Sequence, residues 1–403
     1  MKAAFHIDKI PKLARAAIGV SALAMVLACG GDGASSATPP VTMPGTPTPP
    51  PTPAPTPTPT PSGPQYDLLT IAGDAGPAQI YDPNLEYTGQ TGWLAYTKVD
   101  FDMIPGFPLL HTQIANSVDR GLNWRLSNRA NESIRTQLTE TDGTILDGIW
   151  RYETPAIVHT PDDIAAPWKL FAHKYFWTPA RDRLFEYGWI SMRTAAGPEG
   201  PWGVEEALFG TSFTPAAPFA SRINIADLDP SLADMIVITE PGVLYKDGTL
   251  YLSLSGATSA AGIDRTFLLA SDDQGQNWRY ISNLITKTDA QALGAERYDG
   301  SSLVSFRGDI YLLVSPARGG IAHDGTSVFR FTDIATGQLE RTVSGILREY
   351  HHIARQPEFS GPLGAGQSDY HEDNLGGVLI PQNDGDGPLF FQIFQTGEDI
   401  LGN

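Results

Sequence analysis

Five stretches of the chain repeat one pattern, and this repetition limits the fold more than any other feature. Each stretch has an acidic residue near its start, then a Pro or Gly, a short apolar run, a turn, and a second run rich in Tyr, Leu and Ser. The stretches begin at Tyr81, Tyr152, Thr239, Tyr298 and His371, which are 71, 87, 59 and 73 residues apart. Two short apolar runs joined by a turn are typical of paired antiparallel strands.

From Gln65 to Asn403 the chain consists of short alternating apolar runs, separated by Gly, Asp, Asn and Pro, without a long amphipathic helix. This pattern favours an all-β fold. A four-stranded antiparallel blade with its loops needs about the length of one repeat, and blades packed around an axis leave few exposed sheet edges. The sequence therefore predicts a five-bladed β-propeller of four-stranded antiparallel blades.

The first residues have the order expected of a secretory signal, with basic residues followed by an apolar run from Ala16 to Ala28 that is too short to span a bilayer. Val26 to Gly30 resembles the lipobox of bacterial lipoproteins, which makes Cys29 the lipidated first mature residue. Secretion with a free thiol at Cys29 is the alternative. Because Gly30 and not Asp follows the cysteine, we expect sorting to the outer membrane of a Gram-negative bacterium.

Residues 38–64 contain thirteen prolines, which favour an extended polyproline chain that acts as a spacer. We therefore expect a signal peptide over residues 1–28, a lipidated linker over 29–64 and a propeller domain over 65–403. The formal charge of −18 argues against nucleic acid as a partner and against binding to anionic lipid headgroups. A monomer that contacts the membrane only through its lipid, and that binds a neutral glycan, fits these features best.

Equivalent positions of successive propeller repeats converge on one central funnel, so the repeats predict a site. Several acids around one cavity repel one another, which raises some pKa values and keeps a proton donor available near neutral pH. Glycosidic cleavage needs one ionised and one protonated carboxyl group. The alternative is that such carboxylates cap turns where the strands begin. The aligned residues are Asp82, Glu153, Glu240, Asp299 and either Glu372 or Asp373.

The stretch TEPGVLYKDGTLYLSLSG from Thr239 resembles the third blade of five-bladed propeller glycoside hydrolases, especially family 43. By this resemblance Glu240 would be the general acid. Tyr81-Asp82-Pro83 is similar to the first-blade Asp-Pro of the same enzymes, which makes Asp82 the candidate general base of an inverting reaction. The family has a second-blade aspartate that tunes the acid. Here the aligned residue is Glu153, and Asp227 or Asp229 could take that role instead.

Two segments, SVDRGLNW from Ser117 and SDDQGQNW from Ser271, match the Asp-box pattern of propellers. We expect these boxes to be structural, with the Asp bonded to turn amides, a Gly at positive φ and a Trp packed below. The boxes also resemble those of six-bladed sialidases. The Arg-Ile-Pro signature of the sialidases is missing from this sequence, so a sialidase-like enzyme remains a minor alternative.

Further candidates for substrate binding lie beside the repeats. Trp150 could stack on a sugar ring, while Asp299, His371 and Asp373 could bind sugar hydroxyl groups. We expect no cofactor. The sequence indicates no metal site, because the pair His351-His352 lacks spaced ligands nearby, although an axial cation such as calcium would fit a ring of carboxylates. The alternative to a hydrolase is a tethered propeller that binds a glycan or protein without cleaving it.

Overall fold

The computed structural model describes residues 66–76, 78–101, 108–179, 182–214, 219–259, 262–385 and 387–403. The predicted signal peptide, Cys29 and the linker fall outside this part of the chain. Within it, the helices are all too short or too polar to cross a membrane.

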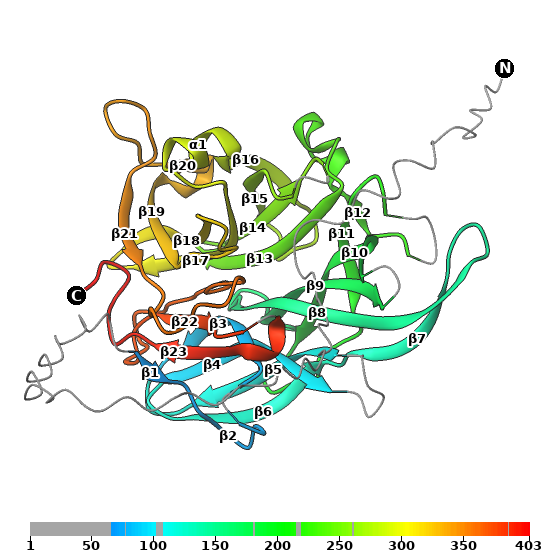
Figure 1. The fold of residues 1–403 in the computed structure, drawn as a ribbon, viewed down its shortest axis with the longest axis horizontal. Coiled ribbons are helices and arrows are strands. Elements are labelled where there is room, and N and C mark those ends of the chain that lie inside the picture. The colour runs from blue at the N-terminus through cyan, green and yellow to red at the C-terminus, as the bar shows by residue number, and fades with distance from the viewer. Residues whose placement is uncertain are drawn as a thin grey trace, which may run out of the picture.

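The described residues form five sheets, so the prediction of an all-β fold is confirmed (Figure 1). The first sheet has the order β2-β6-β5-β4-β3, with the bounds β2 (Ile71–Ala72), β3 (Ile80–Thr88), β4 (Thr91–Phe101), β5 (Pro108–Ser117) and β6 (Trp124–Asn131). The second sheet runs in chain order and contains β7 (Ile134–Thr139), β8 (Ile145–His159), β9 (Trp168–Thr178), β10 (Asp182–Ala195), β11 (Glu206–Gly210) and β12 (Ile223–Asn224).

The third sheet contains β13 (Val237–Lys246), β14 (Thr249–Ala257), β15 (Arg265–Ser271) and β16 (Arg279–Thr286). The fourth contains β17 (Arg297–Phe306), β18 (Asp309–Ala317), β19 (Thr326–Asp333), β20 (Gln338–Leu339) and β21 (Glu349–Ile353). The last contains β1 (Asp67–Leu68), β22 (Leu379–Asn383) and β23 (Phe391–Gln395). The helices are α1 (Lys287–Ala292) and short 3-10 turns at Ile225–Asp227, Pro230–Leu232, Ile334–Thr336 and Pro388–Phe390.

Strand numbers differ among the sheets. Only β13 to β16 form a sheet of four strands, whereas the others have three, five or six. Two-residue strands account for part of the excess, because β2 and β12 add short parallel pairs at the outer edges of the first and second sheets. The hairpin of β7 and β8 adds a further strand to the second sheet.

Local sequence explains why the inner hairpins form. Asp247-Gly248 and Arg307-Gly308 connect paired strands, and all four residues have positive φ, between 51° and 87°. Turns of this kind match the twist of antiparallel strands. Strand β18 shows the expected period of two, since Leu312 packs toward the third sheet and Leu313 toward the last.

The core lies between neighbouring sheets. Phe171 and Ile190 of the second sheet belong to one buried cluster with Leu252 and Phe267 of the third. Similar clusters join every other pair of neighbours, and they contain Leu268 with Leu312, Leu313 with Ile380, Leu94 with Ile393, and Ile114 with Leu170. The five sheets therefore pack in a closed ring, with β3, β13, β17 and β22 as edge strands of their sheets, while β7 covers the first part of β8.

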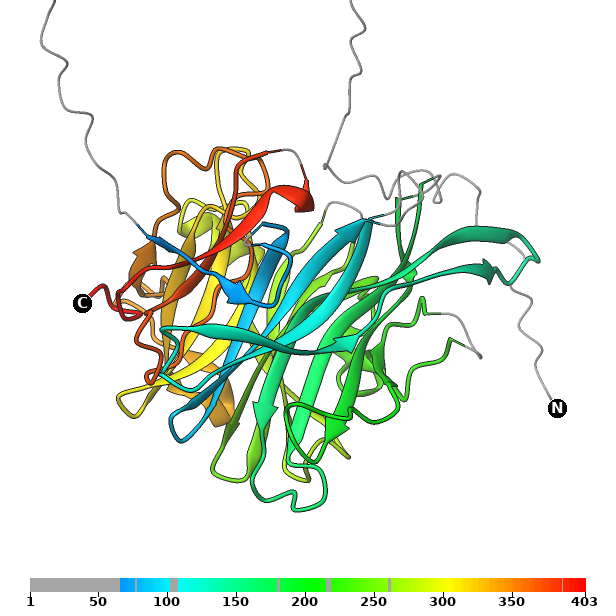
Figure 2. The same ribbon diagram turned by 90° about the horizontal axis from the view of Figure 1, so that it is seen from below.

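The two ends of the described chain close this ring. Strand β1 pairs with β23, with Asp67 opposite Gln395 and Leu68 opposite Phe394. Figure 2 shows this first strand, in blue, lying against the last one, in red. The last sheet is thus completed by residues from the start of the domain.

Candidate functional site

Four strands, β3, β8, β13 and β17, share one irregularity in their pairing. Pairing with the next strand skips two residues after Tyr81 in β3, after Glu153 in β8, after Thr239 in β13 and after Asp299 in β17. Such bulges bend a strand and redirect its side chains. The first skipped residue has positive φ in each case, and these residues are Asp82 (49°), Thr154 (50°), Glu240 (56°) and Gly300 (64°).

This geometry divides the predicted carboxylates into two kinds. Asp82 and Glu240 are themselves the first bulged residues, each followed by a proline. Glu153 and Asp299 precede their bulges by one residue. The alignment by acids had placed all four at one position. In the structure the equivalent positions are set by the bulge and not by the acidic residue. Thr154 and Gly300, and not Glu153 and Asp299, occupy the bulge in their strands.

Glu240 lies in a cluster of three ionisable groups with Asp299 and His323. Their potential ligand atoms are all within 4.8 Å of one another. The backbone amide of Gly300 donates a hydrogen bond of 2.7 Å to Glu240 Oε2. His323 Nε2 lies 3.0 Å from Asp299 Oδ1, and Arg297 Nε donates to Asp299 Oδ2 at 2.8 Å.

These contacts set distinct protonation states. Burial, and then the negative charge of Asp299, raises the pKa of Glu240 to about 7. Burial alone would also raise the pKa of Asp299, but the charges of His323 and Arg297 outweigh it and hold the pKa of Asp299 below its ordinary value. Burial alone would lower the pKa of His323, yet Asp299 raises it to about 9. Near pH 7 a proton therefore resides on Glu240 part of the time, beside an ionised Asp299.

Asp82 and Glu153 form the other half of the site. Burial raises the pKa of Asp82 well above its ordinary value, and the charges of Glu153 and Glu240 raise it further. The backbone amide of Gln367 donates to Asp82 Oδ1 at 3.2 Å and opposes this rise. The Tyr81 hydroxyl donates to Glu153 Oε1 at 2.9 Å. The structure thus brings together Asp82, Glu153, Glu240 and Asp299 from four strands.

The other sequence candidates lie elsewhere. His371 stacks on Tyr87 at 4.5 Å, and Asp373 pairs with Arg120 at 3.4 Å, so both are near the far end of β3. Glu372 is exposed there as well. A carboxylate that does reach β3 is Asp369, on the connection between β21 and β22, which accepts a 2.6 Å hydrogen bond from the Leu85 amide.

Trp150 is also outside the cluster. Its ring contacts Phe176 at 5.1 Å and Trp189 at 5.2 Å, and Lys174 lies over it. Of the two alternative modulators, Asp229 caps the turn Pro230–Leu232 by accepting from the Ser231 amide, and Asp227 is exposed. These contacts give Trp150 and Asp229 structural tasks.

The two S-x-D-x-G-x-N-W segments form matching turns. In the first, Asp119 accepts from the Asn123 amide at 2.9 Å, and in the second Asp273 accepts from the Asn277 amide at 2.8 Å. The Trp278 side chain is buried, and its ring nitrogen donates to Gly275. Strand pairing places both turns at the opposite end of their sheets from Asp82 and Glu240.

Three polar groups of the site were missed by sequence reasoning. His323 lies on the connection between β18 and β19, and Gln367 lies between β21 and β22, where the repeats give no signal. Arg297 lies two residues before Asp299 on β17, and the repeat pattern gave it no role. A metal ion could bind the Glu240, Asp299 and His323 atoms, but the positive charges of Arg297 and His323 already compensate Asp299.

Comparison with solved structures places this geometry in a known fold. An exo-β-1,3-galactanase from Phanerochaete chrysosporium, solved with β-1,3-galactotriose, matches with a TM-score of 0.50 and 12% identity, over 82% of this chain and 64% of the galactanase. The two proteins share a fold. The matched part is less than two thirds of the galactanase. Comparison with protein families finds none that matches the sequence, and comparison with curated proteins finds no match either.

Two further structures match less closely. A family 32 β-fructofuranosidase of Bombyx mori has a TM-score of 0.47 and 13% identity, over 83% of this chain and 61% of that enzyme. A thermostable family 43 glycoside hydrolase has a TM-score of 0.45 and 12% identity, over 82% of this chain and 91% of that enzyme. The likeness in fold rests on the galactanase.

Proposed function

We propose that the chain is a glycoside hydrolase that cleaves a neutral glycan with inversion, on a five-bladed β-propeller whose blades are the five sheets. One observation carries the proposal: Asp82, which is buried, and Glu240, which is partly buried, both have raised pKa values, occupy equivalent bulges of two edge strands and interact electrostatically. The galactanase with the shared fold was solved with a glycan ligand, which supports this substrate class.

In this proposal Glu240 is the general acid. With a pKa of about 7, its carboxyl group keeps a proton near neutral pH and can transfer it to the leaving glycosidic oxygen. Asp82 is the general base and takes a proton from the attacking water on the opposite face of the sugar. The bond to the leaving oxygen breaks as water adds to the anomeric carbon, so one proton leaves the water and another reaches the leaving group.

The structure supports a different division of the remaining carboxylates from the one that the family resemblance implied. Asp299 is the carboxylate whose charge most raises the pKa of Glu240, whereas the charge of Glu153 acts on Asp82. We therefore propose Asp299 as the group that tunes the acid. Glu153, which accepts from Tyr81, raises the pKa of Asp82, and this makes the ionised form of Asp82 a stronger base for the proton of the attacking water.

The N-terminal features belong to the same proposal. Export, lipidation of Cys29, an outer-membrane anchor and a proline-rich spacer would hold a monomeric hydrolase at the cell envelope, where glycans are accessible. The support for these features is the order of residues in the sequence.

The test is hydrolysis of a panel of aryl glycosides and neutral oligosaccharides by the purified full chain and its Glu240→Gln variant. Loss of a general acid lowers the rate by about 10²- to 10⁴-fold. We expect a loss of this size on oligosaccharides and a smaller one on aryl glycosides, whose leaving groups need less protonation. Glu132→Gln, which changes an exposed glutamate, should retain full activity.

Two results would contradict the proposal. One is equal turnover by the wild type and Glu240→Gln. The other is no turnover on any substrate together with glycan binding that Glu240→Gln leaves unchanged, which would make the chain a binding propeller.

A further inference from the structure

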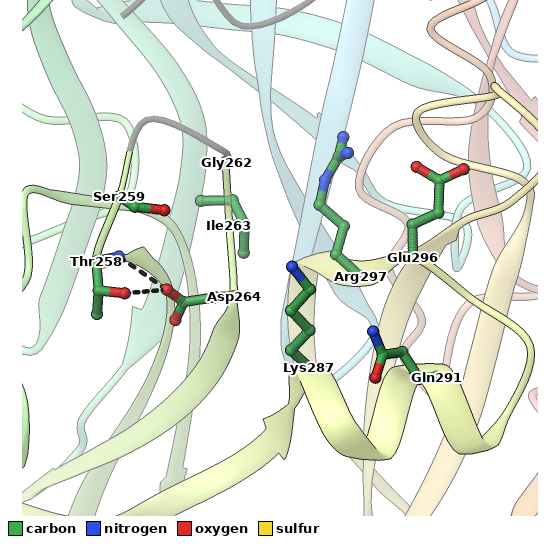
Figure 3. A pocket seen from close by; sticks show the side chains of 9 residues that line it. All are labelled: Thr258, Ser259, Gly262, Ile263, Asp264, Lys287, Gln291, Glu296 and Arg297. Carbon is green, nitrogen blue, oxygen red and sulfur yellow. Dashed lines mark hydrogen bonds between the residues drawn. The ribbon is translucent and has the colours of Figure 1, made fainter. Parts of the chain in front are cut away.

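A polar cavity of about 500 Å³ opens beside the candidate site. One wall is formed by residues 258–259 and 262–264, between β14 and β15, and the other by α1 and the start of β17 (Figure 3). Its lining side chains are mostly charged or hydrogen-bonding, and no aromatic ring is among them. The lining residues are Thr258, Ser259, Gly262, Ile263, Asp264, Lys287, Gln291, Glu296 and Arg297.

The cavity lies on the Glu240 side of the site. Strand pairing puts Ala257, at the end of β14, opposite Val237, at the start of β13, three residues before Glu240. Arg297 connects the two regions, because it lines the cavity and also donates its Nε hydrogen bond to Asp299, the neighbour of Glu240. In the proposed reaction the leaving group lies beyond the general acid, away from Asp82. A leaving group at Glu240 would therefore extend toward this cavity.

Two cations and two carboxylates line the cavity, and Arg297 already forms an ion pair with Asp299. Lys287 has no carboxylate partner among the described residues, and within the same part of the chain the two terminal nitrogens of Arg297 have no hydrogen-bond acceptor. Asp264 is already engaged by the Thr258 amide at 2.9 Å and by Arg265 at 2.8 Å. Glu296 is exposed, and in Figure 3 it stands on the far side of Arg297 from Thr258 and Asp264.

A ligand between the two walls would meet these free donors together. In Figure 3 the side chains of Lys287 and Arg297 extend in the same direction along the side of the cavity opposite Thr258 and Asp264. Such cationic donors form their strongest hydrogen bonds with carboxylates. Two cationic side chains at one cavity are notable because the chain has 45 acidic and only 27 basic residues.

We propose that this cavity binds the leaving-group sugar of the substrate and favours one that carries a carboxylate, that is, a uronic acid. The inference rests on the proposed hydrolase function, because only a cleaved substrate has a leaving group. It changes the expected substrate from a wholly neutral glycan to one with an acidic sugar on one side of the cleaved bond. Lys287 and Arg297 bind the carboxylate, and Gln291 is available for a ring hydroxyl group.

Binding of monosaccharide pairs tests this inference without requiring turnover. The probes are glucuronic acid with glucose and galacturonic acid with galactose, each titrated into the full chain at pH 7 and followed by saturation-transfer NMR. Within each pair only C6 differs, so a difference in affinity reports the carboxylate. We expect at least one uronic acid to bind about fivefold more tightly than its neutral partner, as an exposed charge pair allows.

Two lysine variants locate the effect. Lys287→Met should abolish the preference for the uronic acid, whereas Lys246→Met, at the opposite end of the third sheet, should keep it. Equal affinity for the acidic and neutral sugars would overturn the inference, as would a preference that survives Lys287→Met. Inorganic phosphate is the control for a simple anion: if it competes as strongly as the uronic acid, the cavity binds anions and not a sugar.

The result is separable from that of the hydrolysis panel. Failure of the proposed function appears as missing turnover on every glycoside, while failure of this inference appears as missing discrimination at C6. If turnover is found, Lys287→Met should lower kcat/KM about fivefold for a glycan with an acidic leaving sugar. Lys246→Met should leave kcat/KM for the same glycan at the wild-type value.

Discussion

Asp82 and Glu240 take the same left-handed backbone conformation, with φ of 49° and 56°, at the same bulge of two different strands. This region is costly for residues other than glycine, and strain of this kind is concentrated at functional sites. Each residue is followed by a proline, which fixes the next φ. The shared conformation therefore orients two carboxyl groups by equivalent local structure.

The first prediction follows from this strain. Asp82→Gly should abolish hydrolysis yet increase the free energy of unfolding by about 1 kcal/mol, because glycine tolerates positive φ and the buried carboxylate is removed. Urea unfolding measures the change. Asp309→Gly, at the exposed start of β18, should instead lower stability by about 0.5–1 kcal/mol. A destabilised Asp82→Gly protein would show that the carboxylate stabilises the bulge.

The second prediction concerns the stereochemistry of the same residue. If Asp82 is the base of an inverting reaction, the wild type should release a sugar of inverted anomeric configuration, visible by proton NMR in the first minutes. Azide should restore turnover to Asp82→Gly by replacing the activated water, giving a glycosyl azide of the same inverted configuration. Release of a retained anomer would exclude the base role of Asp82.

The third prediction concerns the pH dependence of activity. Glu240 acts as an acid only while protonated, so activity should fall as the pH rises through about 7. His323 is protonated near this pH, and its positive charge lowers the pKa of Glu240. His323→Gln should therefore move the falling limb of the kcat/KM profile to higher pH. His351→Gln, on β21, should leave the limb in place, and a shift to lower pH in His323→Gln would contradict the electrostatic account.

The fourth prediction uses Asp369, whose pKa burial raises to about 8. The folded protein holds a proton on Asp369 that the unfolded chain, with an aspartate pKa of about 3.9, has lost. Its contribution to stability is therefore full below about pH 4 and is lost as the pH rises toward 8. Asp369→Asn should flatten the decline of Tm between pH 5 and pH 8, whereas Asp324→Asn should not. An unchanged decline in Asp369→Asn would exclude this residue as the cause.

The fifth prediction separates fold from site. Trp278 is buried in the core between the second and third sheets. Trp278→Ala should lower the free energy of unfolding by about 3–5 kcal/mol, as large-to-small changes of buried aromatic residues do. The kcat of the folded fraction should stay at the wild-type value, because the turn lies at the opposite end of the sheet from Glu240. A fall in kcat at constant Tm would place this turn in the reaction.

The all-β fold could be predicted because its signals are local. Alternating apolar residues and turns such as Asp247-Gly248 encode strands and hairpins without help from distant contacts. The sequence also indicates the position of three bulges, because a proline follows the first bulged residue in each. The acidic residues do not mark this position. Alignment on Pro83, Pro155 and Pro241 would have placed Thr154, and not Glu153, opposite Asp82 and Glu240.

Other parts of the site could not be predicted in this way. His323 and Gln367 reach Asp299 and Asp82 only through closure of the ring. No repeat covers their connections, and a histidine or glutamine in a loop has no local signal for a partner on another strand. Likewise, Trp150 precedes Glu153 by three residues, but alternation along β8 directs the two side chains to different environments. The catalytic roles of Asp82, Glu153 and Glu240 and the binding roles of Trp150, His371 and Asp373 stay predictions.

The pairing of β1 with β23 has a mechanical consequence. A force applied to the chain at Tyr66 would first load two ladder positions and the 2.9 Å hydrogen bond from the Tyr66 hydroxyl to Ala354. Short ladders peel apart at low tension, while β22 and β23 remain paired over five positions behind them. Strand β1 would then detach from β23 before the tension could displace the carboxylates around Glu240.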